Sequence, residues 1–132
     1  MAFAETVLHD ELPENGRFVV TPESLECRFV VAFSGKTLKL ADLTGPGLKL
    51  SGIDGSVSSI DDYHLPQRWS VAIYKHPLKV DGILYMSRHM NSGKSVVLFD
   101  RAKRKLKSQR YVPFLKHPDS TNTVLALHVT YA

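Results

Sequence analysis

Two polar residues lie in otherwise apolar segments and are the first candidates for chemistry. Glu5 stands between Phe3 and Val7, and Ser87 ends the apolar run 83–86. A carboxylate can stabilise a developing positive charge, and a hydroxyl can position a polar group of a substrate. Each residue also has a structural interpretation: Glu5 as an exposed acid on a helix face, and Ser87 as a strand-end hydroxyl that hydrogen-bonds the backbone. Taken alone, the residues favour the structural interpretations.

Other motifs exclude several classes of site. The segment Gly93-Lys94-Ser95 matches the end of a phosphate-binding P-loop, but Arg88 stands where that motif needs a glycine. A hairpin loop is therefore the better interpretation. The six histidines contain no pair at spacing i, i+2 or i, i+4, and Cys27 is the single cysteine. We expect no metal site and no disulfide framework.

The densest charge in the chain is a basic run between Arg101 and Arg110. It suggests a nucleic-acid backbone patch, but a solvated surface is the commoner explanation of such a run. No aromatic residue interrupts the run before Tyr111, and proteins that bind single strands place stacking aromatic rings beside their cations. Direct binding to nucleic acid is therefore disfavoured, and it remains only the weakest of the alternative functions.

Length and composition predict one globular domain spanning residues 1–132. Hydrophobic residues make up 43% of the chain and charged residues 23%, with a net charge of +4. The charge is compatible with an anionic small molecule, an acidic protein or nucleic acid, and it does not choose among them. The sequence has no apolar run of the ~18 residues that a membrane span needs, and its start does not resemble a signal peptide. We expect a cytoplasmic protein.

The hydrophobic pattern predicts an α+β fold: a mixed, largely antiparallel sheet with short helices. Residues 13–16 are predicted to form a turn, and residues 44–47 are predicted to end the strand that precedes them. The run 100–109 is left open between a short helix and a solvated connection. The predicted helices span 2–9 and 65–76, and the predicted strands span 25–33, 36–43, 83–86, 95–99 and 123–132.

Five segments in sequence order resemble the RES-domain family, bacterial toxins usually encoded beside an Xre-type antitoxin. The segments are AFAETVLHDE, LKLADLTGPGL, QRWSVAIY, DGILYMSRH and SVVLFDRA, and they span most of the chain from residue 2 to 102. The resemblance implies a fold similar to that of ADP-ribosyltransferase toxins. It also implies consumption of NAD as substrate, by hydrolysis or phosphorolysis of the nicotinamide bond or by transfer of ADP-ribose to a protein.

The family is named for an Arg, a Glu and a Ser, and two of these map onto this chain. The resemblance implies that the family Glu is Glu5 and that the family Ser is Ser87, as catalytic residues, with Ser87 also binding NAD. The family arginine lies before the Glu, where this sequence has four residues, so the chain is expected to be N-terminally truncated relative to the family. Arg88 is not equated with that arginine, because its side chain on a strand would point away from that of Ser87. It is the candidate cation for the NAD phosphates.

The resemblance further implies an Xre-type antitoxin that covers the NAD pocket, and it leaves a homodimer open. No metal and no membrane are expected to take part. Two alternatives to an active NAD-degrading toxin stay open: a truncated, catalytically weak remnant that only binds the antitoxin, and the small basic nucleic-acid-binding domain described above. The acceptor of ADP-ribose, whether water, phosphate or a protein, also stays open.

Overall fold

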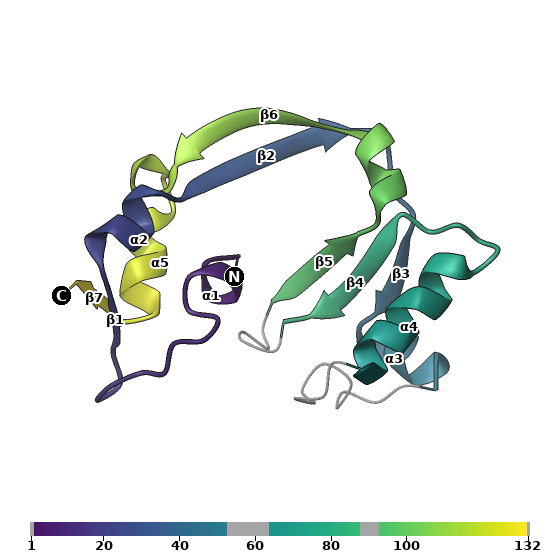
Figure 1. Cartoon of the computed structure of the whole chain (residues 1–132), viewed down its shortest axis with the longest axis horizontal. Helices are drawn as coiled ribbons and strands as arrows, with labels where there is room; N and C mark the ends of the chain where they lie inside the picture. The colour runs from purple at the N-terminus through teal and green to yellow at the C-terminus, as the bar shows by residue number, and fades with distance from the viewer. Residues whose placement is uncertain (1, 53–63, 88–92, 132) are drawn as a thin grey trace. The chain divides into compact units, whose positions relative to one another are not determined.

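The computed structural model describes residues 2–52, 64–87 and 93–131 (Figure 1). Arg88 therefore lies outside the described residues. The described residues form two compact units, one made of residues 35–106 and the other of residues 2–34 together with 107–131. The chain passes between the units twice, once within each strand of a two-stranded ribbon. That the chain behaves as one domain, as its length predicts, stays a prediction.

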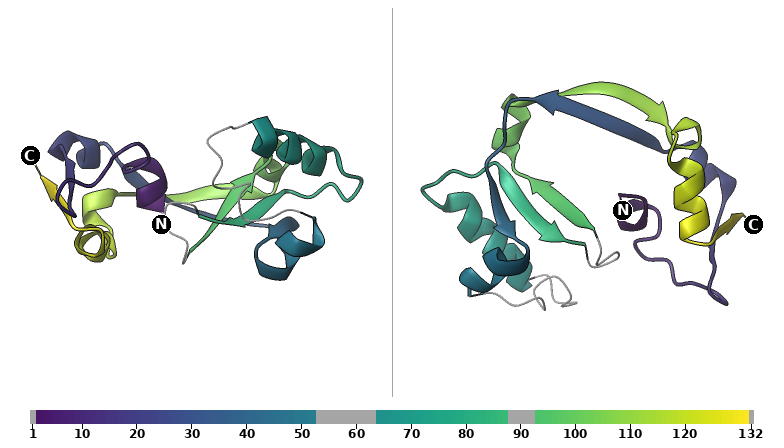
Figure 2. Two further views of the ribbon diagram at one scale, coloured as in Figure 1. Left: turned by 90° about the horizontal axis from the view of Figure 1, so that it is seen from below. Right: turned by 180° about the vertical axis from the view of Figure 1, so that it is seen from behind.

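The first unit holds a three-stranded sheet in the order β3-β4-β5. Strand β4 lies in the middle, parallel to β3 and antiparallel to β5, with Ile83 paired to Ala41 on one side and to Val97 on the other. Figure 2 shows α4 and α3 on opposite sides of this sheet. The elements are β3 (Leu40–Leu43), α3 (Gly45–Leu50), α4 (His64–Lys75), β4 (Gly82–Met86), β5 (Lys94–Leu98) and the 3-10 helix η2 (Asp100–Arg104).

The core of the first unit lies between α4 and one face of the sheet. Val80, Ile83 and Phe99 are buried there, and Ile73 of α4 packs against them. Strand alternation places Ile83 on one face and its neighbours along the strand on the other, so a single face of the sheet supplies the core. This arrangement fixes which residues at the end of β4 point toward α4 and which point away.

The second unit joins the beginning of the chain to its end. Strand β1 runs parallel to β7, with Phe18 paired to Val129. Its core cluster contains Phe3, Leu25 and Phe114, and Leu25 is fully buried. The elements are α1 (Ala2–Thr6), β1 (Phe18–Val20), α2 (Pro22–Glu26), β2 (Phe29–Gly35), β6 (Leu106–Pro113), the 3-10 helix η3 (Phe114–Lys116), α5 (Ser120–Ala126) and β7 (Val129–Tyr131).

Strands β2 and β6 form the two-stranded ribbon, and they run antiparallel (Figures 1 and 2). The Phe114 backbone N–H donates to the Arg28 carbonyl oxygen at 2.8 Å at one end, and the Lys36 N–H donates to the Lys105 carbonyl oxygen at 2.9 Å at the other. At Gly35 the Lys105 carbonyl oxygen lies where a Cβ would stand, so a side chain cannot fit without movement of the backbone. Glycine is therefore required at position 35, where the two strands approach closely.

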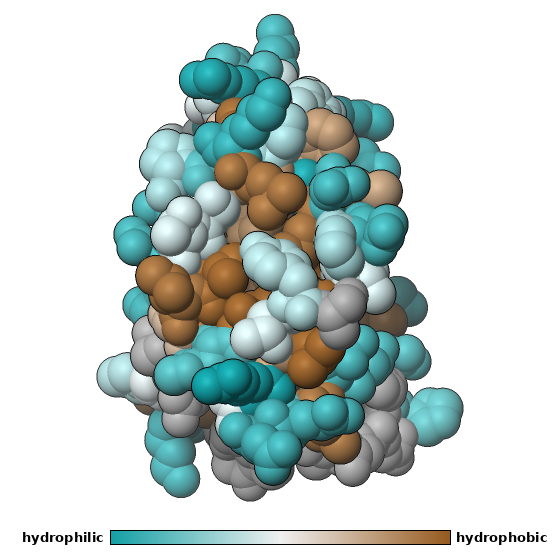
Figure 3. All heavy atoms as spheres, turned by 90° about the vertical axis from the view of Figure 1, so that its left-hand side faces the viewer, coloured by the Kyte–Doolittle hydropathy of each residue, from teal (hydrophilic) through white to brown (hydrophobic). Residues whose placement is uncertain are grey.

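Large hydrophobic side chains also reach the surface. The face displayed in Figure 3 carries hydrophobic residues near its middle, with hydrophilic residues around them. In the second unit Leu12 is 84% exposed and Leu125 is 67% exposed. Single exposed hydrophobic residues are ordinary in proteins, so these positions carry no conclusion by themselves.

The predicted α+β class is confirmed, and the described sheets mix parallel with antiparallel pairs. The helix predicted over 65–76 is confirmed as α4, and the strands predicted over 83–86 and 95–99 are confirmed as β4 and β5. The helix predicted over 2–9 is confirmed but ends at Thr6. The open run 100–109 divides into η2 and the first part of β6. The predicted strand 36–43 shortens to Leu40–Leu43.

Two predicted strands were partly wrong. The segment 25–33 begins inside helix α2, because Thr21 caps that helix and Pro22 stands in its first turn, where proline is well tolerated. Only Phe29–Gly35 forms the strand β2.

The segment 123–132 likewise begins inside helix α5 and reaches strand only at Val129. Its apparent alternation is misleading, because Val124 and Leu127 pack on the core at helical spacing. His128, with a φ of 50°, then separates the helix from β7.

Candidate functional site

Ser87 stands at the carboxyl end of β4, as the sequence predicts. The antiparallel ladder with β5 continues to it, because the Ser87 N–H donates to the Gly93 carbonyl oxygen at 3.0 Å. The residue is only 1% exposed. Strand alternation places Ser87 on the same face as Ile83 and Tyr85, which is the face that packs toward α4. A hydroxyl is thus held in a defined position at the end of the middle strand.

A second buried hydroxyl follows the neighbouring strand. Because β3 is parallel to β4 and Leu43 pairs with Tyr85, Thr44 and Ser87 follow the same edge of the sheet. Thr44 is 8% exposed. Its hydroxyl and its backbone N–H both donate to Asp42 Oδ1, at 2.6 and 2.8 Å. Thr44 is not among the predicted site residues, although Asp followed two residues later by Thr just after a strand is a recognisable turn signal.

The carboxylate of Asp42 is held in its charged form at this edge. The Thr44 hydroxyl bond lowers the pKa of Asp42 most, the Thr44 N–H bond adds to it, and the positive charge of Lys94 lowers it further. Lys94 begins β5 opposite Met86, and the strand register places it on the face that also carries Asp42. The edge therefore presents an anion and a cation on one face, and Ser87 on the other.

An ion pair lies at the opposite end of β4, between the buried Asp81 and the half-buried Lys105. Asp81 is 1% exposed, and its Oδ2 accepts hydrogen bonds from the Lys105 ammonium and from the Lys39 backbone N–H, both at 2.7 Å. These two bonds, with the Lys105 bond first, hold the pKa of Asp81 below its ordinary value. The Phe99 N–H also donates to the Asp81 carbonyl oxygen at 2.8 Å. Because Asp81 links β3, β5 and the start of β6, its position indicates a structural role.

Glu5 lies on α1 in the second unit, directly after the buried residues Phe3 and Ala4. It is half-buried, so the interpretation of Glu5 as an exposed acid is wrong. Glu5 and Ser87 belong to different units, and the structure describes each within its own unit. Their shared role at one substrate stays a prediction.

The basic run predicted as a charged surface is partly engaged in internal contacts. The guanidinium of Arg101 stacks over the ring of Tyr74, 4.2 Å from its centroid, and donates to the Tyr74 carbonyl oxygen at 2.7 Å. This bond satisfies a carbonyl in the last turn of α4, which lacks a partner within the helix. Lys105 pairs with Asp81. These two cations of the run therefore stabilise the first unit.

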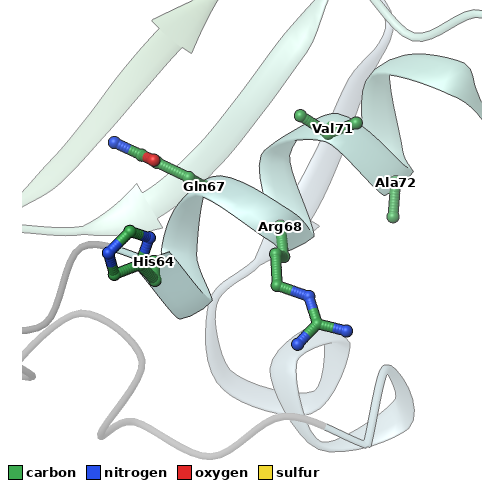
Figure 4. A pocket seen from close by; sticks show the side chains of 5 residues that line it. All are labelled: His64, Gln67, Arg68, Val71 and Ala72. Carbon is green, nitrogen blue, oxygen red and sulfur yellow. The ribbon is translucent and has the colours of Figure 1, made fainter.

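A hollow of about 420 Å³ lies along α4. Its lining side chains point in different directions from the helix rather than converging on one point (Figure 4). Binding sites need a few polar groups aimed at the same ligand, so this hollow is not a candidate site. The lining residues are His64, Gln67, Arg68, Val71 and Ala72.

The described ranges are residues 2–52, 64–87 and 93–131. Within them, no group of three or more His, Cys, Asp or Glu side chains gathers as a metal site would require. Within them also, every helix is too short or too polar to cross a bilayer.

Comparison with known proteins supplies a family. The profile of the RES domain matches residues 1–120, a range that runs through both compact units and includes Glu5 and Ser87. A protein of Sinorhizobium fredii described as "Probable toxin y4kH" is 35% identical over 88 residues, which is 67% of this chain and 68% of that protein. No solved structure matches the chain significantly.

Proposed function

Because the chain belongs to the RES-domain family, we propose that it is a toxin that breaks the bond between nicotinamide and ribose in NAD. The observation that carries the proposal is the match over residues 1–120, which takes in both Glu5 and Ser87. Two further findings support it. A relative of 35% identity is described as a toxin, and Ser87 is a buried hydroxyl at the end of the middle strand of its sheet.

The chemistry suits these residue types. Nicotinamide leaves NAD as a neutral base, so bond cleavage needs no general acid. The ribose then develops the positive charge of an oxocarbenium ion, as in other glycosidic cleavages. In the proposal, Glu5 stabilises that charge with its carboxylate and accepts hydrogen bonds from the ribose hydroxyls.

Ser87 has a positioning role in the proposal. Its backbone is fixed by the ladder bond to Gly93, so a hydroxyl that orients the nicotinamide ribose or a phosphate loses little freedom on binding. Arg88, the next residue, is assigned to the phosphates of NAD, because guanidinium groups bind phosphate oxygens with two parallel hydrogen bonds.

A protein that consumes NAD must be restrained in the cell that makes it. We therefore propose an antitoxin protein of the Xre type as its partner, a cytoplasmic location, and toxin–antitoxin control of the type II kind. The acceptor of ADP-ribose remains open among water, phosphate and a protein. The products identify it: free ADP-ribose, its phosphate ester, or a modified protein.

Release of nicotinamide from NAD by the purified chain tests the proposal. We expect Glu5→Gln to lower the rate about 100- to 1,000-fold, as loss of one charge-stabilising group does in other enzymes. We expect Ser87→Ala to lower it roughly 10- to 150-fold, which corresponds to losing a hydrogen bond to a charged group. Ser87→Ala keeps the backbone bond to Gly93, so the fold should be retained.

Matched controls separate these roles from general damage. Glu11→Gln changes an exposed acid of the same unit as Glu5, and Ser51→Ala changes an exposed serine of the same unit as Ser87. Both should release nicotinamide at the unaltered rate. Normal release by Glu5→Gln or Ser87→Ala would remove that residue from the mechanism. A folded chain that binds the antitoxin without releasing nicotinamide would favour the catalytically weak remnant instead.

A further inference from the structure

The outer edge of β5 is the open edge of the three-stranded sheet in the first unit. Among the described residues β5 pairs with β4 alone, in the strand order β3-β4-β5 (Figure 1). Backbone hydrogen bonds close the ladder between β4 and β5 at both ends. The Ser87 N–H donates to the Gly93 carbonyl oxygen at 3.0 Å, and the Phe99 N–H donates to the Asp81 carbonyl oxygen at 2.8 Å. These two bonds fix which residues of β5 face β4.

The direction of every backbone group in β5 follows from these bonds. Hydrogen-bonded and non-bonded pairs alternate along an antiparallel ladder, so Ser95 and Val97 direct their N–H and C=O groups at β4. Lys94, Val96 and Leu98 direct theirs outward, away from the sheet. In the part of the chain that the structure describes, no hydrogen bond reaches these outward groups. The edge therefore offers three donors and three acceptors to another strand.

Apolar side chains accompany the outward backbone groups. Strand alternation places Lys94, Val96 and Leu98 on the face of the sheet opposite to Ile83. Val96 and Leu98 are each 44% exposed, and Val97 on the other face is also 44% exposed. Proteins protect exposed edges with prolines, bulges or several charges, whereas β5 carries one charge, at its first residue. This edge is therefore suited to pairing with another chain.

Electrostatics favours an acidic partner for the edge. Residues 35–106 contain twelve Lys and Arg residues against six Asp and no Glu, an excess of six positive charges. Lys94 is exposed, and no carboxylate of the described residues forms an ion pair with it. A second copy of the chain would bring two such excesses of charge together, which disfavours pairing of β5 with itself. The occupant that fits is acidic.

We propose that the open edge of β5 binds an extended acidic segment of another protein, which joins the sheet as a fourth strand antiparallel to β5. Main-chain hydrogen bonds to Lys94, Val96 and Leu98 supply the binding, and side chains supply the selection. Apolar residues of the segment lie opposite Val96 and Leu98, and an acid lies opposite Lys94. The proposal does not rest on NAD cleavage, so either can fail without the other.

NMR of the isotope-labelled full chain, titrated to millimolar concentration with the peptide acetyl-Val-Thr-Val-Thr-Glu-amide, tests the proposal. In the antiparallel arrangement the two valines of the peptide lie opposite Leu98 and Val96, and its glutamate lies opposite Lys94. We expect amide exchange to slow at these three residues and to stay unchanged at Ser95 and Val97, because the outward amides alone gain partners. This alternation is the signature of an added strand.

Three altered peptides separate main-chain pairing from charge. Methylation of the nitrogen of the second valine removes an N–H that faces β5, and it should weaken binding roughly 2- to 12-fold or more. Methylation of the nitrogen of the second threonine changes an N–H that points away from β5, and it should leave binding unchanged. Lysine in place of the glutamate should weaken binding roughly 2- to 30-fold, because an attraction to Lys94 becomes a repulsion.

A matched pair of variants tests the edge from the side of the chain. Val96→Glu places a negative charge on the edge and should weaken binding of the acidic peptide roughly 2- to 30-fold. Val71→Glu makes the same change on α4 of the same unit, at a residue that is 50% exposed, and should bind the peptide as the unaltered chain does. Circular dichroism checks that both variants fold.

Three results would overturn the proposal. The first is unchanged exchange in β5 at millimolar peptide, and the second is slowing without the alternation or equal binding of the two methylated peptides. The third is slowing at Lys94, Val96 and Leu98 that grows with the concentration of the chain in the absence of peptide, which would assign the edge to a second copy.

Discussion

Leu25→Ala tests whether the two compact units are independent in stability. Leu25 is fully buried in the core of the second unit, whereas the core of the first unit is a separate cluster around Ile83. Truncation of a fully buried leucine to alanine costs about 2–5 kcal/mol. A unit of about 60 residues has roughly 3–9 kcal/mol of stability in total. The change should therefore remove about a fifth or more of the stability of the second unit.

Hydrogen exchange measured by mass spectrometry separates the units. A loss of about 3 kcal/mol corresponds to a fall of roughly 150-fold in protection. We expect that fall in peptides from β1, α5 and β7, while peptides from β4 and β5 keep their protection. Trp69 is the single tryptophan and lies on α4 in the first unit. The urea midpoint of its fluorescence change should therefore be the same as in the unaltered chain.

Two variants complete the design. Leu12→Ala makes the same change at a leucine that is 84% exposed, and surface changes of this kind stay within about 0.5 kcal/mol. Ile83→Ala should give the converse pattern, with protection lost in β4 and β5. Equal loss of protection in both units on Leu25→Ala would refute the reasoning, and would support the single cooperative domain that the length of the chain predicts.

Three further predictions concern single contacts. Asp81→Asn should lower the melting temperature near pH 7, because the Asp81 carboxylate stabilises the fold only while it is charged. The difference in melting temperature from the unaltered chain should shrink as the pH falls below about 3.9 toward the lowered pKa of Asp81. A difference that stays constant down to acid unfolding would contradict this. Gly35→Ala should lower the free energy of unfolding in urea by about 1–3 kcal/mol, because the added Cβ collides with a backbone carbonyl. At Gly16 an added Cβ meets open space, so Gly16→Ala measures the cost of the left-handed backbone alone. Equal losses in the two variants would count against the collision. Thr44→Val should raise the pKa of Asp42, measured by NMR titration of its carboxyl carbon, and an unchanged pKa would exclude the hydroxyl bond as its main cause.

The elements that sequence patterns predict well are those in which one local signal dominates. The apolar runs of β4 and β5 and the amphipathic spacing of α4 are signals of this kind. The patterns misled where a helix precedes a strand without a break in hydrophobicity. At Leu25 the helix is set by the cap at Thr21, outside the apolar run, and at Val124 the helical spacing is visible only once the core is known.

Some residues of the candidate site are likewise indicated by a local sequence pattern, and others are not. Ser87 is visible in the sequence because a polar residue ends an apolar strand, and the structure confirms its burial. Thr44 depends on the parallel pairing of β3 with β4, which no local pattern encodes. The ion pair of Asp81 and Lys105 joins residues 24 positions apart, and no local pattern in the sequence indicates it. Long-range pairing is the information that sequence patterns lack.

Proton NMR of NAD incubated with the purified chain tests the central claim most directly. The account predicts that the signals of free nicotinamide grow with time, at a rate proportional to the concentration of the chain, and that Glu5→Gln suppresses this growth. Intact NAD after prolonged incubation with folded protein would contradict the claim that this RES-domain chain is an NAD-cleaving toxin.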